Sequence, residues 1–140
     1  MLEQDTFFMK EALKLANIAF KEDEVPVGAI ITQGDKIIGK GYNQVELLKD
    51  PTAHAEILAI TAACNLLGNK YLVKCTIYVT LEPCMMCIGA IREAQIQRVV
   101  FAAKDTTHKK LQANLFEMEG GILETESATL IKDFFKRKRI

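Results

Sequence analysis

The sequence has no net charge, few histidines and no long apolar run. Its 140 residues contain 18 lysines and arginines against 18 aspartates and glutamates. A balanced chain carries no whole-molecule footprint for nucleic acid, so any such contact must be local. No segment approaches the roughly 18 consecutive apolar residues of a membrane span, and no apolar run follows a basic start at the N-terminus. We therefore expect a soluble, cytoplasmic protein that does not insert into a membrane.

The chain also lacks repeats, low-complexity segments and any composition typical of a linker. A length of 140 residues fits one ordinary domain, so we expect a single domain over residues 1–140. The four cysteines of a cytoplasmic chain are better candidates for reduced thiols or metal ligands than for disulfides. Cys64 and Cys75 stand apart from any motif and are predicted to be small buried residues.

Apolar periodicity predicts alternating helices and strands. Helical spacing begins at Asp5 or Thr6, either of which is placed to cap a first helix that ends near residue 21. Two short apolar runs around a Gln-Gly-Asp turn predict a hairpin over residues 25–42. The remaining predicted elements are a helix over 53–67 capped by Thr52, a strand over 75–81, a helix over 84–93, a strand over 98–103 and a helix over 127–138. This alternation predicts an α/β fold in which helices cover both faces of a sheet.

Two short polar motifs stand at the predicted helix starts. One contains His54, which is one of only two histidines, and the other contains Cys84 and Cys87. The cysteines are three positions apart, so on one helix their sulfurs lie on the same face. One nitrogen and two sulfur donors give zinc three protein ligands and leave a fourth position for water, as in catalytic sites. We predict that His54, Cys84 and Cys87 bind Zn²⁺; the alternatives are a redox Cys-x-x-Cys motif, core cysteines and a structural histidine.

Glu56 lies two positions after His54. Residues two apart do not share a helix face, so Glu56 is not expected to be a second ligand beside His54. A carboxylate near a zinc site can take a proton from water and pass it to a ring nitrogen and then to a departing amine. That proton transfer is what hydrolytic deamination needs. We predict that Glu56 is catalytic; the alternative is a solvated surface residue.

These residues resemble the zinc nucleobase deaminases, whose signature is H-x-E followed by P-C-x-x-C. Within that family the chain is most similar to the bacterial tRNA-specific adenosine deaminases, which convert a wobble adenosine of tRNA to inosine. The matching stretches are residues 24–29, 50–57, 79–87, 98–101 and 133–135 with the basic tail behind them. The resemblance implies a three-layer α/β/α sandwich with a mixed central sheet, as in cytidine deaminase. It also implies zinc on the three ligands, proton transfer by Glu56, and a homodimer with active sites near the subunit interface.

The same resemblance implies three substrate contacts. Asn43 would hydrogen-bond the base, the Ala53 backbone would lie along it, and Asp105 would contact the nucleotide beside the target. An asparagine is also an ordinary turn residue, and a loop aspartate can cap whatever follows it. Residues 106–115 depart from the family pattern and are shorter than the corresponding segment.

Three functions stay open at this point. An RNA-directed adenosine deaminase, acting on a tRNA anticodon loop, is favoured by the motif context and by the basic residues 136–139. A deaminase of a free nucleobase or nucleoside, such as guanine, cytosine or a related heterocycle, is favoured by the neutral charge and the altered segment. A non-catalytic zinc-stabilised module would need His108 as a fourth ligand. A single basic surface formed by residues 136–139 with Lys109 and Lys110 beside the pocket would favour RNA.

Overall fold

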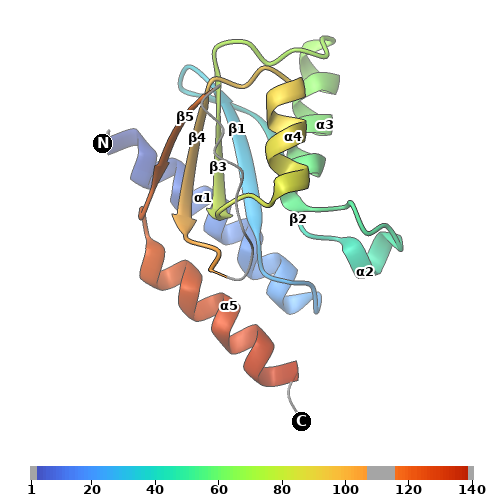
Figure 1. Cartoon of the computed structure of the whole chain (residues 1–140), viewed down its shortest axis with the longest axis vertical. Helices are drawn as coiled ribbons and strands as arrows, with labels where there is room; N and C mark the ends of the chain where they lie inside the picture. The colour runs from blue at the N-terminus through green and yellow to red at the C-terminus, as the bar shows by residue number, and fades with distance from the viewer. Residues whose placement is uncertain (1–2, 107–115, 139–140) are drawn as a thin grey trace.

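A computed structural model describes residues 3–106 and 116–138 as a five-stranded sheet with helices packed on it (Figure 1). The elements in chain order are α1 (Glu3–Lys21), β1 (Gly28–Gln33), β2 (Lys36–Tyr42), α2 (Val45–Leu48), α3 (Ala55–Leu67), β3 (Cys75–Leu81), α4 (Met85–Glu93), β4 (Arg98–Ala103), β5 (Glu117–Gly120) and α5 (Glu124–Lys138). The strand order is β2-β1-β3-β4-β5. Strand β1 runs antiparallel to β2 and β3, whereas β3, β4 and β5 are parallel. The prediction of an α/β fold with a mixed sheet is confirmed.

Helices cover both faces of the sheet because neighbouring strand residues point to opposite sides. Ile30 and Tyr78 pack against α1, while Ile31 and Val79 pack in the cluster that contains α3 and α4 residues. Helix α5 contacts α1, β3 and β4. The three-layer prediction is therefore confirmed. Among the described helices, none has the length and apolar character needed to cross a membrane.

Two glycines of β2 allow α3 to lie close to the sheet. A Cβ atom at Gly39 would lie 2.5 Å from the Ala59 carbonyl oxygen, and one at Gly41 would lie 2.5 Å from the Ala55 carbonyl oxygen. Real Cβ atoms do not approach backbone that closely, so only glycine permits this packing. The close contact brings the start of α3, and with it His54, to the end of β2.

The predicted hairpin is confirmed as β1 and β2, and helix α5 begins at Glu124, three residues before the predicted start. Helix α2 and strand β5 were not predicted, because four residues are too few for a periodic pattern to show. Cys75 is buried as predicted, whereas Cys64 is only partly buried.

Two predicted helix caps are wrong. Helix α3 begins at Ala55 with His54 in the cap position, whereas Thr52 donates its backbone N–H and its hydroxyl to the Asp50 carboxylate, both at 2.8 Å. The short Asp50 side chain closes a local turn there and delays the helix start. At the N-terminus, Asp5 lies inside α1 and is fully buried, so it pairs with other side chains instead of capping.

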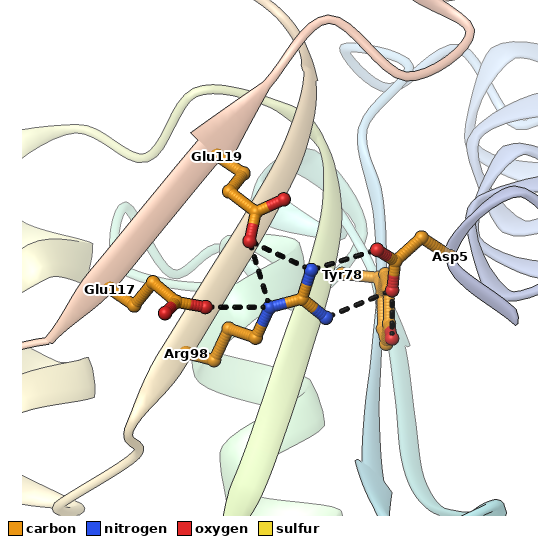
Figure 2. A network of polar contacts seen from close by, with 5 residues as sticks. All are labelled: Asp5, Tyr78, Arg98, Glu117 and Glu119. Carbon is orange, nitrogen blue, oxygen red and sulfur yellow. Dashed lines mark hydrogen bonds and ion pairs between the residues drawn. The ribbon is translucent and has the colours of Figure 1, made fainter. Parts of the chain in front are cut away.

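The partners of Asp5 form a polar network across α1, β3, β4 and β5 (Figure 2). The Arg98 guanidinium donates to both carboxylate oxygens of Asp5, at 2.9 and 2.7 Å, and Tyr78 donates its hydroxyl to Asp5 at 2.8 Å. Arg98 also donates to Glu117 and Glu119 on β5. Burial and the Asp5 charge raise the pKa of Tyr78, and its hydrogen bond to Asp5 raises the pKa of Arg98. The network joins the first helix to the edge of the sheet.

Candidate active site

The candidate site lies at the end of the sheet where β2, β3 and β4 end and β1 begins. Gly28 of β1 pairs with Tyr42 of β2, and Ala29 pairs with Val79 of β3. The carboxyl ends of β2, β3 and β4 therefore meet beside the start of β1. The segments that follow these three strands carry Asn43, Cys84 and Asp105. Ligands of open α/β sheets commonly bind at such an edge.

His54, Cys84 and Cys87 converge there. Their donor atoms all lie within 4.8 Å of one another, and the His54 Nδ1 atom lies 3.8 Å from Cys84 Sγ and 3.6 Å from Cys87 Sγ. For a tetrahedral zinc with Zn–N of about 2.05 Å and Zn–S of about 2.3 Å, nitrogen and sulfur are roughly 3.6 Å apart. The spacing of the three donors therefore fits zinc.

Helix starts place these donors. His54 is the cap residue of α3 and Cys84 that of α4, both with extended backbone and neither with a side-chain cap bond. Each side chain is thus available for another partner, while the backbone carbonyls of His54 and Cys84 accept the first helical hydrogen bonds. Cys87 follows in the first turn of α4. The positive ends of the two helices favour thiolates at this point.

The charges and burial of the donor cluster favour a bound cation. Burial raises the pKa of the Cys87 thiol, and the nearby Glu56 carboxylate and Cys84 thiol raise it further. Burial lowers the pKa of His54, which keeps the imidazole neutral, as a metal ligand must be. A hydrogen bond to the Pro51 backbone opposes that shift, and because proline has no N–H, its carbonyl is the acceptor. Carbonyl acceptors of this kind orient metal-binding histidines.

Glu56 is buried, with 4% of its surface exposed, and lines the same cavity as His54 and Cys84. It is therefore not a solvated surface residue. Inside a regular helix, side chains two positions apart point to different faces. His54 precedes the helix in extended conformation, so this restriction does not apply to His54 and Glu56. The helix start thus lets a carboxylate two positions away face the same site.

Asn43 and Asp105 line this cavity too, whereas Ala53 is buried and does not. The Asn43 side-chain oxygen accepts the Ala55 N–H at 2.7 Å, which directs the side-chain NH₂ elsewhere. The Ala53 carbonyl accepts the Gln44 N–H at 3.0 Å. The Asp105 N–H donates to the Glu82 carboxylate at 3.1 Å. The structure thus brings together five of the seven predicted site residues in one cavity, whereas Cys87 and Ala53 are buried and do not line it.

The cavity has a volume of about 1280 Å³ and extends from the donor cluster to α5. This exceeds the roughly 300–1,000 Å³ of ordinary small-molecule pockets. Its walls include residues for which the sequence predicted no role in the site: Glu22, Asp23, Glu24, Val45, Glu46, Leu47, Glu82, Ala128, Ile131, Lys132 and Phe135. They come from segments far apart in the sequence, so no local pattern groups them together.

The basic residues predicted to mark an RNA surface are only partly described. Lys104, Lys132 and Lys138 line the cavity, and Arg137 pairs with Asp23 at its rim. His108, the predicted fourth ligand of a zinc-stabilised module, and Lys109, Lys110 and Arg139 of the predicted basic surface lie outside the described residues.

The family model for the cytidine and deoxycytidylate deaminase zinc-binding region matches residues 2–103. The chain belongs to this family. It is therefore a zinc-dependent hydrolytic deaminase, and the predictions of zinc as cofactor and of an enzyme are confirmed. The family match favours a catalytic site over a zinc-stabilised module.

Named relatives extend the comparison. The tRNA-specific adenosine deaminase of Aquifex aeolicus is 44% identical to this chain, and the match covers 95% of each protein. A solved structure from work on A-to-I editing by tRNA:A34 deaminases at the wobble position is 37% identical, with a TM-score of 0.84; the match covers 89% of this chain and 99% of that one. The guanine deaminase of Bacillus subtilis is 33% identical, with a TM-score of 0.70; that match covers 98% and 76%.

Proposed function

We propose that this deaminase converts the wobble adenosine of a tRNA to inosine and releases ammonia. The observation that carries the proposal is the 44% identity, over nearly the whole chain, to a tRNA-specific adenosine deaminase. A wobble base lies in a single-stranded anticodon loop, so it can enter a pocket with little unpairing. The cavity volume of about 1280 Å³ leaves room for nucleotides beside the reacting base.

His54, Cys84 and Cys87 would hold the zinc, and Glu56 would move the protons. When bound, zinc lowers the pKa of a water toward neutrality. Glu56 would take one proton from the attacking water and deliver it to the ring nitrogen of adenine, and would then take the second proton from the added hydroxyl and pass it to the departing amine. Water and adenosine are consumed, and inosine and ammonia are formed. The burial of Glu56 beside Cys87 supports this assignment, because it places the carboxylate next to the donor cluster.

Asn43, Ala53 and Asp105 would bind the substrate. Since the Asn43 oxygen already accepts the Ala55 N–H, Asn43 would offer its NH₂ group to an acceptor on the base. The Ala53 backbone would lie along the base. Asp105, held by Glu82, would contact the flanking nucleotide. Lys104, Lys132 and Lys138 at the cavity supply positive charge for phosphates.

We further propose a single deaminase domain over residues 1–140, cytoplasmic and homodimeric. Support for a dimer comes from exposed apolar side chains at the start of α4, beside the donor cluster. Met85 and Met86, between the two cysteines, are 54% and 37% exposed. Exposed apolar side chains that cluster are typical of protein contacts.

A second candidate is deamination of a free nucleobase such as guanine. The likeness to the Bacillus subtilis guanine deaminase over 98% of the chain favours it specifically. Both functions would use the same zinc ligands and Glu56, so they differ only in the residues around the outer cavity.

The test is a turnover assay on zinc-loaded protein with unmodified tRNA that bears a wobble adenosine, alongside a panel of free bases and nucleosides. We expect inosine at the wobble position and no ammonia from the small substrates. A tRNA with guanosine at that position serves as the control. Ammonia from a free base, with no inosine in the tRNA, would contradict the proposal and establish the second candidate.

A further inference from the structure

Three consecutive carboxylates, Glu22, Asp23 and Glu24, form the turn between α1 and β1, and we name these residues the acidic turn. All three line the cavity of the candidate active site. Figure 1 shows this turn near both α2 and the end of α5. Neither the zinc cluster nor the proposed proton transfer uses any of them.

The backbone sends these side chains in different directions. Asp23 has a positive φ of 65°, the Asp23 N–H donates to the Phe20 carbonyl, and the Glu24 N–H donates to the Ala19 carbonyl. This pair of bonds is a Schellman motif, which ends α1 with one left-handed residue. Aspartate tolerates that conformation better than most residues. The motif thus fixes the turn without help from its side chains.

Each carboxylate then binds a different element of the fold. Glu24 is 2% exposed and accepts the backbone N–H groups of Glu46 and Leu47, at 3.0 and 2.8 Å, at the start of α2. Glu22 accepts the Tyr42 hydroxyl at the end of β2, with both oxygens at 3.2 Å. The turn therefore contacts two elements that line the cavity, α2 and α5, and also the end of β2.

Asp23 holds the end of α5. Its carboxylate pairs with Arg137 at 3.1 Å and with Lys138 at 2.5 Å, and Arg137 also donates to the Phe20 carbonyl and stacks over the Phe20 ring. Asp23 is 60% exposed, so these ion pairs add little to stability. Their effect is to fix where the last turn of α5 lies.

We propose that the acidic turn is a positioning element that sets the distance between α2 and α5, and thereby the fit of the nucleotides around the reacting base. This proposal rests on the proposed function. Helices α2 and α5 contribute Leu47, Ile131 and Phe135 to the cavity, away from the zinc donors. Displaced walls would weaken substrate binding while the chemistry at Glu56 continues. The acidic turn consequently governs KM for tRNA and leaves kcat nearly unchanged.

The main test is Glu24→Gln, which keeps one acceptor oxygen but turns an NH₂ group toward the second N–H. We expect KM for tRNA to rise about tenfold, with kcat within about twofold of wild type. Zinc content should not change. The matched control is Glu93→Gln, which removes the same charge from an exposed position at the end of α4 that does not line the cavity. An unchanged KM, or an equal loss in kcat, would overturn the proposal.

Hydrogen–deuterium exchange of residues 44–49 tests the same step without any substrate. In Glu24→Gln the amides of Glu46 and Leu47 should exchange at least about tenfold faster, and in Glu93→Gln at the wild-type rate. Unchanged exchange would overturn the proposal. If wild-type protein fails to deaminate tRNA, the proposed function fails, and exchange still decides whether Glu24 positions α2.

Asp23→Asn tests the α5 half of the proposal, since asparagine also tolerates a positive φ. We expect KM for tRNA to rise about threefold, because α5 loses its two ion pairs to the acidic turn and keeps the contacts of Arg137 with Phe20. A fall in KM would overturn this half: it would mean that Asp23 competes with RNA phosphates for Arg137 and Lys138.

Discussion

The donor cluster and the Arg98 network lie at opposite ends of β4. Both contain buried polar groups, but the charges around those groups differ. In the Arg98 network, one guanidinium meets Asp5, Glu117 and Glu119, so opposite charges satisfy one another. In the donor cluster, burial, the Glu56 carboxylate and the Cys84 thiol together raise the pKa of Cys87. The Arg98 network is therefore stable without an added ion, whereas a bound cation would stabilise the donor cluster. Removing a residue should therefore cost stability at one end and metal with activity at the other.

Cys87→Ala should have the largest effect on function. Changes outside the ligand set commonly cost about 10- to 100-fold in metal affinity, so loss of a ligand should cost more than 100-fold and abolish deamination. Zinc per chain after dialysis, measured by mass spectrometry, checks this. Cys75→Ala, which removes a buried cysteine outside the cluster, is the control and should keep its zinc. Full zinc occupancy in Cys87→Ala would contradict the assignment.

Asp5→Ala should disrupt the Arg98 network and lower stability. It leaves Arg98 without its buried partner, and the free energy of unfolding should fall by about 3 kcal/mol. Urea unfolding measures the loss. Glu119→Gln, at a partly exposed partner of the same arginine, should cost about 1 kcal/mol. At a temperature where Asp5→Ala is folded, its turnover should equal that of wild type; a loss of turnover there would show that the two ends are coupled.

Asn43 lies between the two cases, because it accepts the Ala55 N–H in the fold and, in the proposed function, also binds the substrate. Asn43→Ala should lower kcat/KM roughly 10- to 100-fold and leave the buried Ala55 N–H without an acceptor. Asn43→Asp keeps that acceptor and loses the NH₂ donor, so it should recover stability without recovering kcat/KM. Recovery of both would remove Asn43 from the substrate contacts.

The smallest expected effect is a pH dependence of the zinc-free protein. Burial lowers the pKa of His54 below its usual 6.5. As the pH falls below about 6.5, the unfolded chain binds a proton that the folded chain does not, so stability decreases in that window. Above it, the His54 contribution is complete. Urea midpoints of chelated protein at pH 7.5 and 5.5 check this, and His54→Ala should reduce the difference. A midpoint that rises at low pH would contradict the sign.

The sequence predicted the donor cluster well because its members lie in two short motifs at helix starts, where spacing carries meaning. The Arg98 network escaped prediction, since Asp5 and Arg98 are 93 positions apart. Asp5 also resembles a helix cap in sequence, and only the fold reveals that it is buried. The acidic turn escaped for the same reason: Glu24 binds residues 22 and 23 positions away.

The layers and the main strands followed from apolar periodicity. The short elements did not, because α2 and β5 are set by contacts with Glu24 and Arg98. Thr52 was predicted to be a cap because a hydroxyl next to a helix start is typical of a cap. In the structure that hydroxyl instead donates to the Asp50 carboxylate, which closes a turn before the helix. The displacement by two residues decides where His54 points, so the site geometry needed the structure.

The most direct test is to measure zinc content and wobble-adenosine deamination of Glu56→Gln in one preparation. If the three ligands bind the metal and Glu56 moves the protons, we expect one zinc per chain, as in wild type, and a turnover lower by about 100- to 10,000-fold, the usual contribution of a general acid–base. Wild-type turnover, or loss of zinc from this variant, would contradict these roles.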